Sequence, residues 1–131
     1  IDASVAVKWF LPEQDALVAR KLLDASERLL APAFLLIEVG YVLLKKERRG
    51  EARSGMTSRA LRWLKSSDVA FIDDQDLVFP ALSFALSSTQ SFYDCMYLAA
   101  ISPDGQGSFD KLATFDALLS ALAHRHFIPL W

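Results

Sequence analysis

The sequence is poor in cysteine, with Cys95 alone among its 131 residues. An internal disulfide is therefore excluded, and a reducing cytoplasm is the expected compartment. No apolar run approaches the roughly 20 residues that a membrane-spanning helix needs, and no signal peptide is visible. Because the chain begins at Ile1 without a methionine, we expect that the start of its first strand is missing.

Two common kinds of site are also missing. No glycine-rich GxxxxGK loop occurs, which argues against an ATPase. The histidines are His124 and His126 alone, at a spacing unlike that of a zinc-binding helix pair, so we expect them to be solvated. Repeats, low-complexity tracts and linkers are absent too. With 53% apolar and 23% charged residues, the composition indicates one globular domain over residues 1–131.

The net charge of −2 is unevenly distributed. Residues 45–65 hold eight bases and two acids, a local charge of +6, so the rest of the chain carries −8. This asymmetry is typical of a surface that faces a polyanion, although a solvated helical face would have the same composition. The bases of the segment are Lys45, Lys46, Arg48, Arg49, Arg53, Arg59, Arg62 and Lys65.

Apolar periodicity predicts alternating strands and helices. We expect Pro12 and Pro32 each to lie in the first turn of a helix, and Gly50 to end the second of these helices. Pro80 should kink its helix or lie in the first turn. The alternation indicates an α/β fold with a mostly parallel sheet and helices on both faces. The expected strands are residues 1–3, 28–32, 69–73, 111–115 and 127–130, and the expected helices are 12–27, 32–50, 51–66, 75–88, 91–101 and 116–126.

Four carboxylates stand where apolar residues are expected. Asp2 and Asp116 follow predicted strands, and ligands bind outside the carboxyl ends of strands in open α/β sheets. Glu38 is embedded in the apolar run FLLIEVGYVLL, and Asp94 opens an apolar helix. Buried together, these groups would repel one another and their pKa values would rise. A hard cation such as Mg²⁺ or Mn²⁺, which prefers oxygen ligands, resolves the conflict.

Each acid also has a purely structural interpretation, which the sequence leaves open. Asp2 would cap a helix after the first strand, and Asp116 would cap the last helix. Ser91 and Asp94 fit the capping-box pattern. Glu38 is the hardest to explain, because a buried glutamate away from a helix end needs an ion pair with a core base.

Four segments in this order resemble a PIN domain, and closely the VapC-type toxins of toxin–antitoxin pairs: IDASVAVKWF, APAFLLIEVGYVLL, SFYDCMYLAA and LATFD. The resemblance covers essentially the whole chain. It implies a three-layer α/β/α fold with a central, mostly parallel sheet. It also implies a Mg²⁺- or Mn²⁺-dependent endoribonuclease in which water attacks in line and leaves a 5′-phosphate and a 3′-hydroxyl.

The resemblance also assigns residues. Ser4 and Thr114 match hydroxyl residues that orient carboxylates or water. The long loop at 102–110 and Cys95 depart from the family pattern; we treat Asp104 and Asp110 as loop acids and Cys95 as a packing residue. The family's metal-holding catalytic acids fall on Asp2, Glu38, Asp94 and Asp116.

The resemblance further implies an RNA substrate, a homodimer and a silencing antitoxin protein. The basic segment, above all Lys45, Lys46, Arg48, Arg49 and Arg53, would hold the RNA backbone. Partner contacts are expected at apolar faces, for which the candidates are Trp9, Phe10, Tyr41 and Trp63. Two other classes are considered: a degenerate module that binds RNA or a protein without cutting, and a receiver-like phosphoacceptor. The second would need an acidic pair after the first strand and a lysine after the last, and the sequence has neither.

Overall fold

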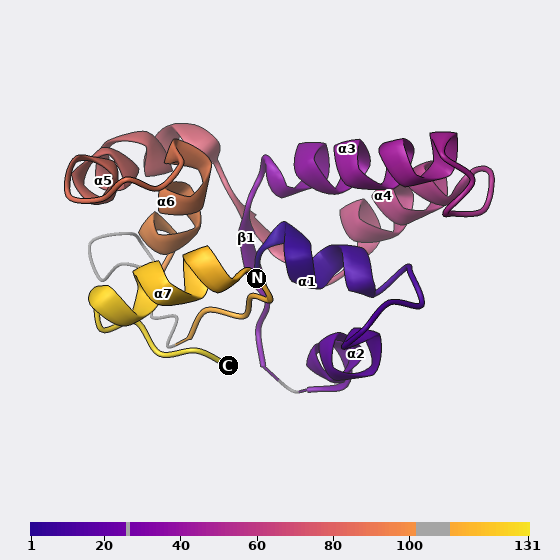
Figure 1. Ribbon diagram of the computed structural model, residues 1–131, viewed down its shortest axis with the longest axis horizontal. Coiled ribbons are helices and arrows are strands. Elements are labelled where there is room, and N and C mark those ends of the chain that lie inside the picture. The colour runs from indigo at the N-terminus through magenta and orange to yellow at the C-terminus, as the bar shows by residue number, and fades with distance from the viewer. Residues whose placement is uncertain (26, 102–110) are drawn as a thin grey trace.

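A short parallel sheet stands at the centre of the computed structural model, which describes residues 1–25, 27–101 and 111–131 (Figure 1). The loop that carries Asp104 and Asp110 lies outside the described residues. Within these ranges no helix is long and apolar enough to cross a membrane. The elements, in chain order, are α1 (Ala3–Lys8), α2 (Ala16–Asp24), β1 (Leu30–Pro32), α3 (Leu35–Arg48), α4 (Met56–Ser66), β2 (Ala70–Ile72), α5 (Asp74–Leu86), α6 (Phe92–Ala99) and α7 (Ala117–Arg125).

The strands β1 and β2 run parallel, with Leu30 opposite Ala70 and Pro32 opposite Ile72. Parallel neighbours need a long crossover, which α3 and α4 supply as an antiparallel pair. Figure 1 shows this pair on one side of β1, with α5 and α6 packed together on the other side. The predicted strands at 28–32 and 69–73 are confirmed, although both are shorter than predicted.

Backbone pairing extends this layer beyond the named strands. The backbone nitrogen of Ile1 donates to the carbonyl of Leu30 at 2.7 Å. Leu112 forms a parallel bridge with Leu130 near the other end of the chain. The segments predicted as strands at 1–3, 111–115 and 127–130 thus pair in the sheet layer, but only through isolated backbone hydrogen bonds. The prediction of regular strands at 111–115 and 127–130 was therefore wrong. The expected mostly parallel sheet with flanking helices is confirmed.

Pro12 and Pro32 lie outside the positions predicted for them, whereas Pro80 lies inside its helix, where a kink was one of the two predictions. Pro32 is the last residue of β1 and does not open α3, and Pro12 precedes α2 by several residues. Pro80 lies inside α5, beyond its first turn. The predicted end of α3 is confirmed, because Gly50 follows it with a φ of +74°, a left-handed conformation that glycine adopts without strain.

One apolar core joins the helices to the strands. Cys95 is fully buried in it, so its prediction as a packing residue is confirmed. Trp9 is also a core residue: its indole N–H donates to the carbonyl of Ala19 at 2.8 Å, and its ring meets that of Trp63 edge to face. Trp9 is therefore not exposed for a partner. The largest fully buried side chains include Leu35, Leu43, Leu64, Leu77, Leu98, Leu112, Leu119 and Leu122.

Candidate active site

Asp2 is a buried acid at the junction of the sheet layer and α1. Its backbone N–H donates to the carbonyl of Ala113 at 3.2 Å, and its side chain is the N-cap of α1, accepting from Val5 N at 3.1 Å. The capping interpretation of Asp2 is therefore confirmed. The residue is only 4% exposed, and burial raises the pKa of its carboxyl group, although hydrogen bonds from neighbouring hydroxyls oppose the rise.

Two hydroxyl groups hold the carboxylate of Asp2. Ser4 Oγ donates to Oδ1 at 2.7 Å, and Thr114 Oγ donates to Oδ2 at 2.6 Å. Each hydroxyl also accepts a backbone N–H, from Phe115 at 2.8 Å and from Asp116 at 2.9 Å respectively. Because these amides occupy the acceptor side, both hydroxyl protons are directed at Asp2. This geometry agrees with the orienting role expected for Ser4 and Thr114, which stays a prediction.

Glu38 lies in the first turn of α3, because that helix begins at Leu35 and not at Pro32. The prediction of a mid-helix acid was therefore wrong, and the helix dipole favours an acid at this end. Its side chain is half-buried and accepts a short hydrogen bond from the hydroxyl of Tyr97. The partner of Glu38 is therefore a phenol, whereas the purely structural interpretation of this acid required an ion pair with a basic residue in the core. Burial raises the pKa of Glu38, against the effect of the Tyr97 hydrogen bond.

Asp94 opens α6, and its own backbone N–H is capped by the hydroxyl of Ser91 at 3.1 Å. The N-cap that the sequence predicts at Ser91 is thus confirmed. The charges of Asp94 and Asp2 both act on Glu38 and raise its pKa further. Asp2 at the start of α1 and Asp94 on α6 are therefore both within electrostatic reach of Glu38 on α3. Their assignment as site residues stays a prediction.

Asp116 is placed differently. It is exposed and caps α7, where its Oδ1 accepts from Leu118 N at 2.8 Å and from Leu119 N at 2.9 Å. The capping interpretation is therefore confirmed for this residue. Its backbone N–H holds Thr114, so Asp116 adjoins the acids at the edge of the site.

The donor set has the chemistry of a Mg²⁺ or Mn²⁺ site. Asp2, Glu38 and Asp94 offer carboxylate oxygens, and the ion pairs of the described residues include none of the three. In the described part of the chain, however, no three such side chains stand close enough together to hold an ion by themselves. Mg²⁺ commonly keeps several waters and takes one or two carboxylates, so the acids fit an ion held partly through water.

Tyr97 is the site residue that the sequence analysis missed. It is 4% exposed on α6, its ring meets that of Phe34 edge to face, and its hydroxyl reaches Glu38. Burial and the charge of Glu38 raise the pKa of the phenol, so it stays a neutral donor. A tyrosine at an apolar position of a predicted helix normally indicates core packing. The sequence feature that could have identified Tyr97 is its spacing of three residues from Asp94, which places both residues on one face of the helix.

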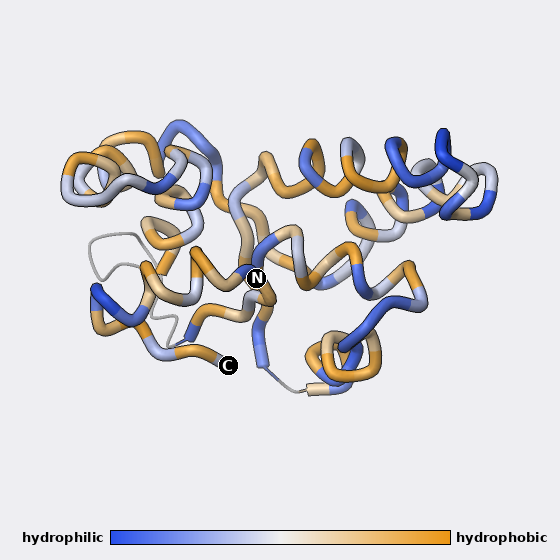
Figure 2. The backbone as a smooth tube through the Cα atoms, viewed as in Figure 1, coloured by the Kyte–Doolittle hydropathy of each residue, from blue (hydrophilic) through white to orange (hydrophobic). Residues whose placement is uncertain are grey.

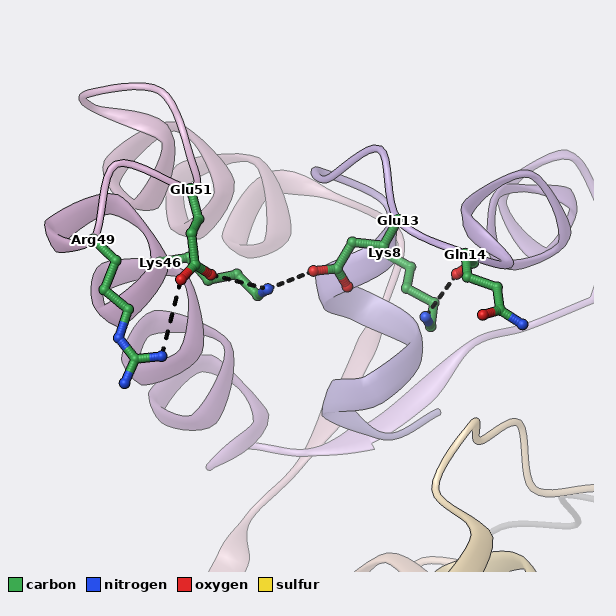
Figure 3. Close-up of polar contacts among 6 residues, drawn as sticks. All are labelled: Lys8, Glu13, Gln14, Lys46, Arg49 and Glu51. Carbon is green, nitrogen blue, oxygen red and sulfur yellow. Dashed lines mark hydrogen bonds and ion pairs between the residues drawn. The ribbon is translucent and has the colours of Figure 1, made fainter.

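The basic segment lies on the arm formed by α3 and α4, whose far end is strongly hydrophilic in Figure 2. Lys46 is committed to acids: it pairs with Glu13 at 2.6 Å and with Glu51 at 3.7 Å, and Arg49 also reaches Glu51 at 3.9 Å (Figure 3). The other bases of this segment are exposed: Lys45, Arg48, Arg53, Arg59, Arg62 and Lys65.

Comparison with known proteins agrees with this architecture. The family model described as "PIN domain" matches residues 1–130. The crystal structure of Mycobacterium tuberculosis VapC20, a Sarcin-Ricin loop cleaving toxin, superposes with a TM-score of 0.69 at 17% identity, covering 92% of this chain and 91% of that one. No curated protein sequence matches this chain. From its match over nearly every residue, we conclude that this chain belongs to the PIN domain family.

Proposed function

We propose that this protein is a Mg²⁺- or Mn²⁺-dependent endoribonuclease and the toxin of a toxin–antitoxin pair. The supporting observation is that the charges of Asp2 and Asp94 both reach Glu38, in a chain of the PIN family. The likeness in fold to VapC20, a toxin that cleaves the sarcin–ricin loop, supports the RNA substrate class. A noncatalytic module has no need for a half-buried Glu38 whose pKa is raised by burial and by the charges of two further acids.

In this proposal the three acids hold the ion, some through water, and Asp116 contributes from the edge of the site. A bound ion supplies a water of lowered pKa and neutralises charge on the phosphate. The chain's own groups do the positioning: Ser4 and Thr114 fix the carboxylate of Asp2. Water is the nucleophile, so no side chain forms a bond to phosphorus.

The arm supplies a surface that binds the phosphate backbone of RNA. At 1.5 Å rise per residue, Lys45 is about 10 Å and Arg48 about 15 Å from Glu38 along the axis of α3. A strand held by these bases therefore extends from the acids to the arm over several nucleotides. Lys46 and Arg49 contribute less, because their charges are shared with Glu13 and Glu51.

The contacts with protein partners are proposed at exposed apolar side chains. Ile37 is 73% and Tyr41 67% exposed on one face of α3, beside the bases, and Trp63 on α4 is also exposed. These residues are the proposed contacts for a second copy of the chain or for an antitoxin. Because RNA is the substrate and the one cysteine is a buried thiol, we propose that the protein acts in the cytoplasm.

The decisive experiment compares Asp94→Asn with the wild type in RNA cleavage at several Mg²⁺ and Mn²⁺ concentrations. We expect cleavage to fall on the order of a thousandfold, because a metal-holding charge is removed. The fold should persist, since Ser91 caps the backbone of residue 94 and not its side chain. Asp76→Asn, which removes an exposed acid from the first turn of α5, is the matched control. RNA binding without cleavage by the wild type at every metal concentration would favour the noncatalytic module instead.

A further inference from the structure

The hydroxyl of Tyr97 joins two of the elements that carry the acids. It donates to Oε2 of Glu38 on α3. Tyr97 itself belongs to α6, one turn after Asp94. A single oxygen atom on α6, the helix of Asp94, therefore holds the acid in the first turn of α3.

The phenol ring holds this oxygen in place. The side chain is 4% exposed, and its ring contacts that of Phe34 with 5.1 Å between centroids and 60° between planes. Phe34 is the N-cap residue of α3, directly before the turn that carries Glu38. The ring and the hydroxyl therefore act on the same turn, and the direction of the Glu38 carboxylate is fixed from outside α3.

From this geometry we propose that Tyr97 is a positioning residue that fixes the carboxylate of Glu38 for binding of the divalent ion. The inference rests on the proposed function. It differs from a packing role, because packing needs the aromatic ring and positioning needs the hydroxyl group. Tyr97→Phe removes the hydroxyl alone and separates the two roles.

The chain offers a matched control in Tyr93. This residue lies one turn earlier on α6, and its ring also meets that of Phe34 edge to face, at 5.6 Å. It is 60% exposed. Tyr93→Phe therefore removes a phenol oxygen from the same helix and the same aromatic contact, but from a solvent-facing position.

The test is calorimetric titration of Mn²⁺ into the metal-free protein, with Tm measured alongside. We expect Tyr97→Phe to weaken Mn²⁺ binding about 10- to 100-fold, as removal of an outer hydrogen-bond partner of a metal ligand does. Tyr93→Phe should bind Mn²⁺ like the wild type. In a Glu38→Gln background, Tyr97→Phe should have no further effect, because its influence passes through Glu38.

Several results would overturn the inference. Wild-type Mn²⁺ affinity in Tyr97→Phe would do so, as would an equal fall in affinity in the Glu38→Gln background. A large fall in Tm together with abolished binding would assign Tyr97 to packing alone. If Glu38→Gln weakens binding and Tyr97→Phe does not, only this inference fails. If the wild type binds no Mn²⁺ at all, the proposed function fails with it.

Discussion

Thr114 donates a 2.6 Å hydrogen bond to Asp2, a residue 112 positions away in the chain. Replacing it by valine keeps the shape and removes the donor. We expect Thr114→Val to reduce cleavage about 10- to 100-fold and to destabilise the fold by about 1–3 kcal/mol, because a buried carboxylate is deprived of a partner. Thr114→Ser keeps the hydroxyl and should retain most of the cleavage activity and most of the stability of the wild type. Measurements of kcat and of urea unfolding check this; equal effects of valine and serine would contradict it.

Asp2 should show opposite effects on activity and stability. In Asp2→Asn the amide oxygen still caps α1 and accepts from the Ser4 hydroxyl, and the Thr114 hydroxyl can rotate to accept from the amide N–H. Because burial of the charged carboxylate is unfavourable, the metal-free variant should have a Tm equal to or above that of the wild type. Cleavage should fall roughly a thousandfold. A variant that is clearly less stable than the wild type at neutral pH would show that the charge stabilises the fold.

The raised pKa values of Asp2 and Glu38 predict a pH dependence of stability. A carboxyl whose pKa is higher in the folded state than its ordinary value, 3.8 for Asp and 4.5 for Glu, favours folding while it is protonated. That contribution is complete below the ordinary pKa and disappears as the pH rises through the folded-state pKa. The metal-free wild type should therefore become less stable over this range relative to the Asp2→Asn, Glu38→Gln double variant.

Thermal melts from about pH 4 to about pH 8 measure this difference. The Tm of the double variant minus that of the wild type should grow as the pH rises. Mg²⁺ should reduce the difference, and more at pH 7 than at pH 5, because the ion binds the deprotonated carboxylates. A Tm difference that is constant with pH would disprove the assigned shifts.

The exposed bases of the arm should act on RNA binding and not on the chemical step. We expect the triple variant Lys45→Ala, Arg48→Ala, Arg53→Ala to raise KM for RNA and leave kcat unchanged. The slope of log affinity against log salt should become shallower by about 0.7 for each phosphate of a single strand that the variant no longer neutralises. The triple variant Lys21→Ala, Lys111→Ala, Arg125→Ala removes three exposed bases outside the arm and controls for net charge. A changed kcat with an unchanged salt slope would show that the arm does not belong to the surface that binds RNA.

Glu47 should be a structural acid without a catalytic role. Its carboxylate accepts from the backbone N–H groups of Gly55 and Thr57 and from the Thr57 hydroxyl, and so it fixes the start of α4. Glu47→Ala should lower Tm by several degrees, as removal of a helix cap does, with unchanged kcat at temperatures well below Tm. Glu51→Ala, which removes only surface ion pairs, should change Tm much less.

The sequence predicted features that depend on pattern and spacing. The apolar periodicity located the helices other than α1, which it did not predict, and the positions of Asp2 and Asp116 after strand-like segments placed both at one edge of the sheet layer. It misjudged Pro32 because a proline at a strand end and one at a helix start have the same local sequence. It missed Tyr97 because burial of a phenol depends on the helix packed against it, and that packing has no local signature. The N-cap at Asp116 was visible from spacing, but its exposure was not.

The pairing of residue 2 with residues 113 and 114 has a consequence for synthesis of the chain. A ribosome releases the polypeptide from its amino end, so the acids of α1, α3 and α6 emerge well before the segment that clamps Asp2. Until Thr114 has left the exit tunnel, the Asp2 side chain lacks one of its two hydroxyl donors. Under the proposed function, the nascent chain therefore lacks full cleavage activity until Thr114 has emerged.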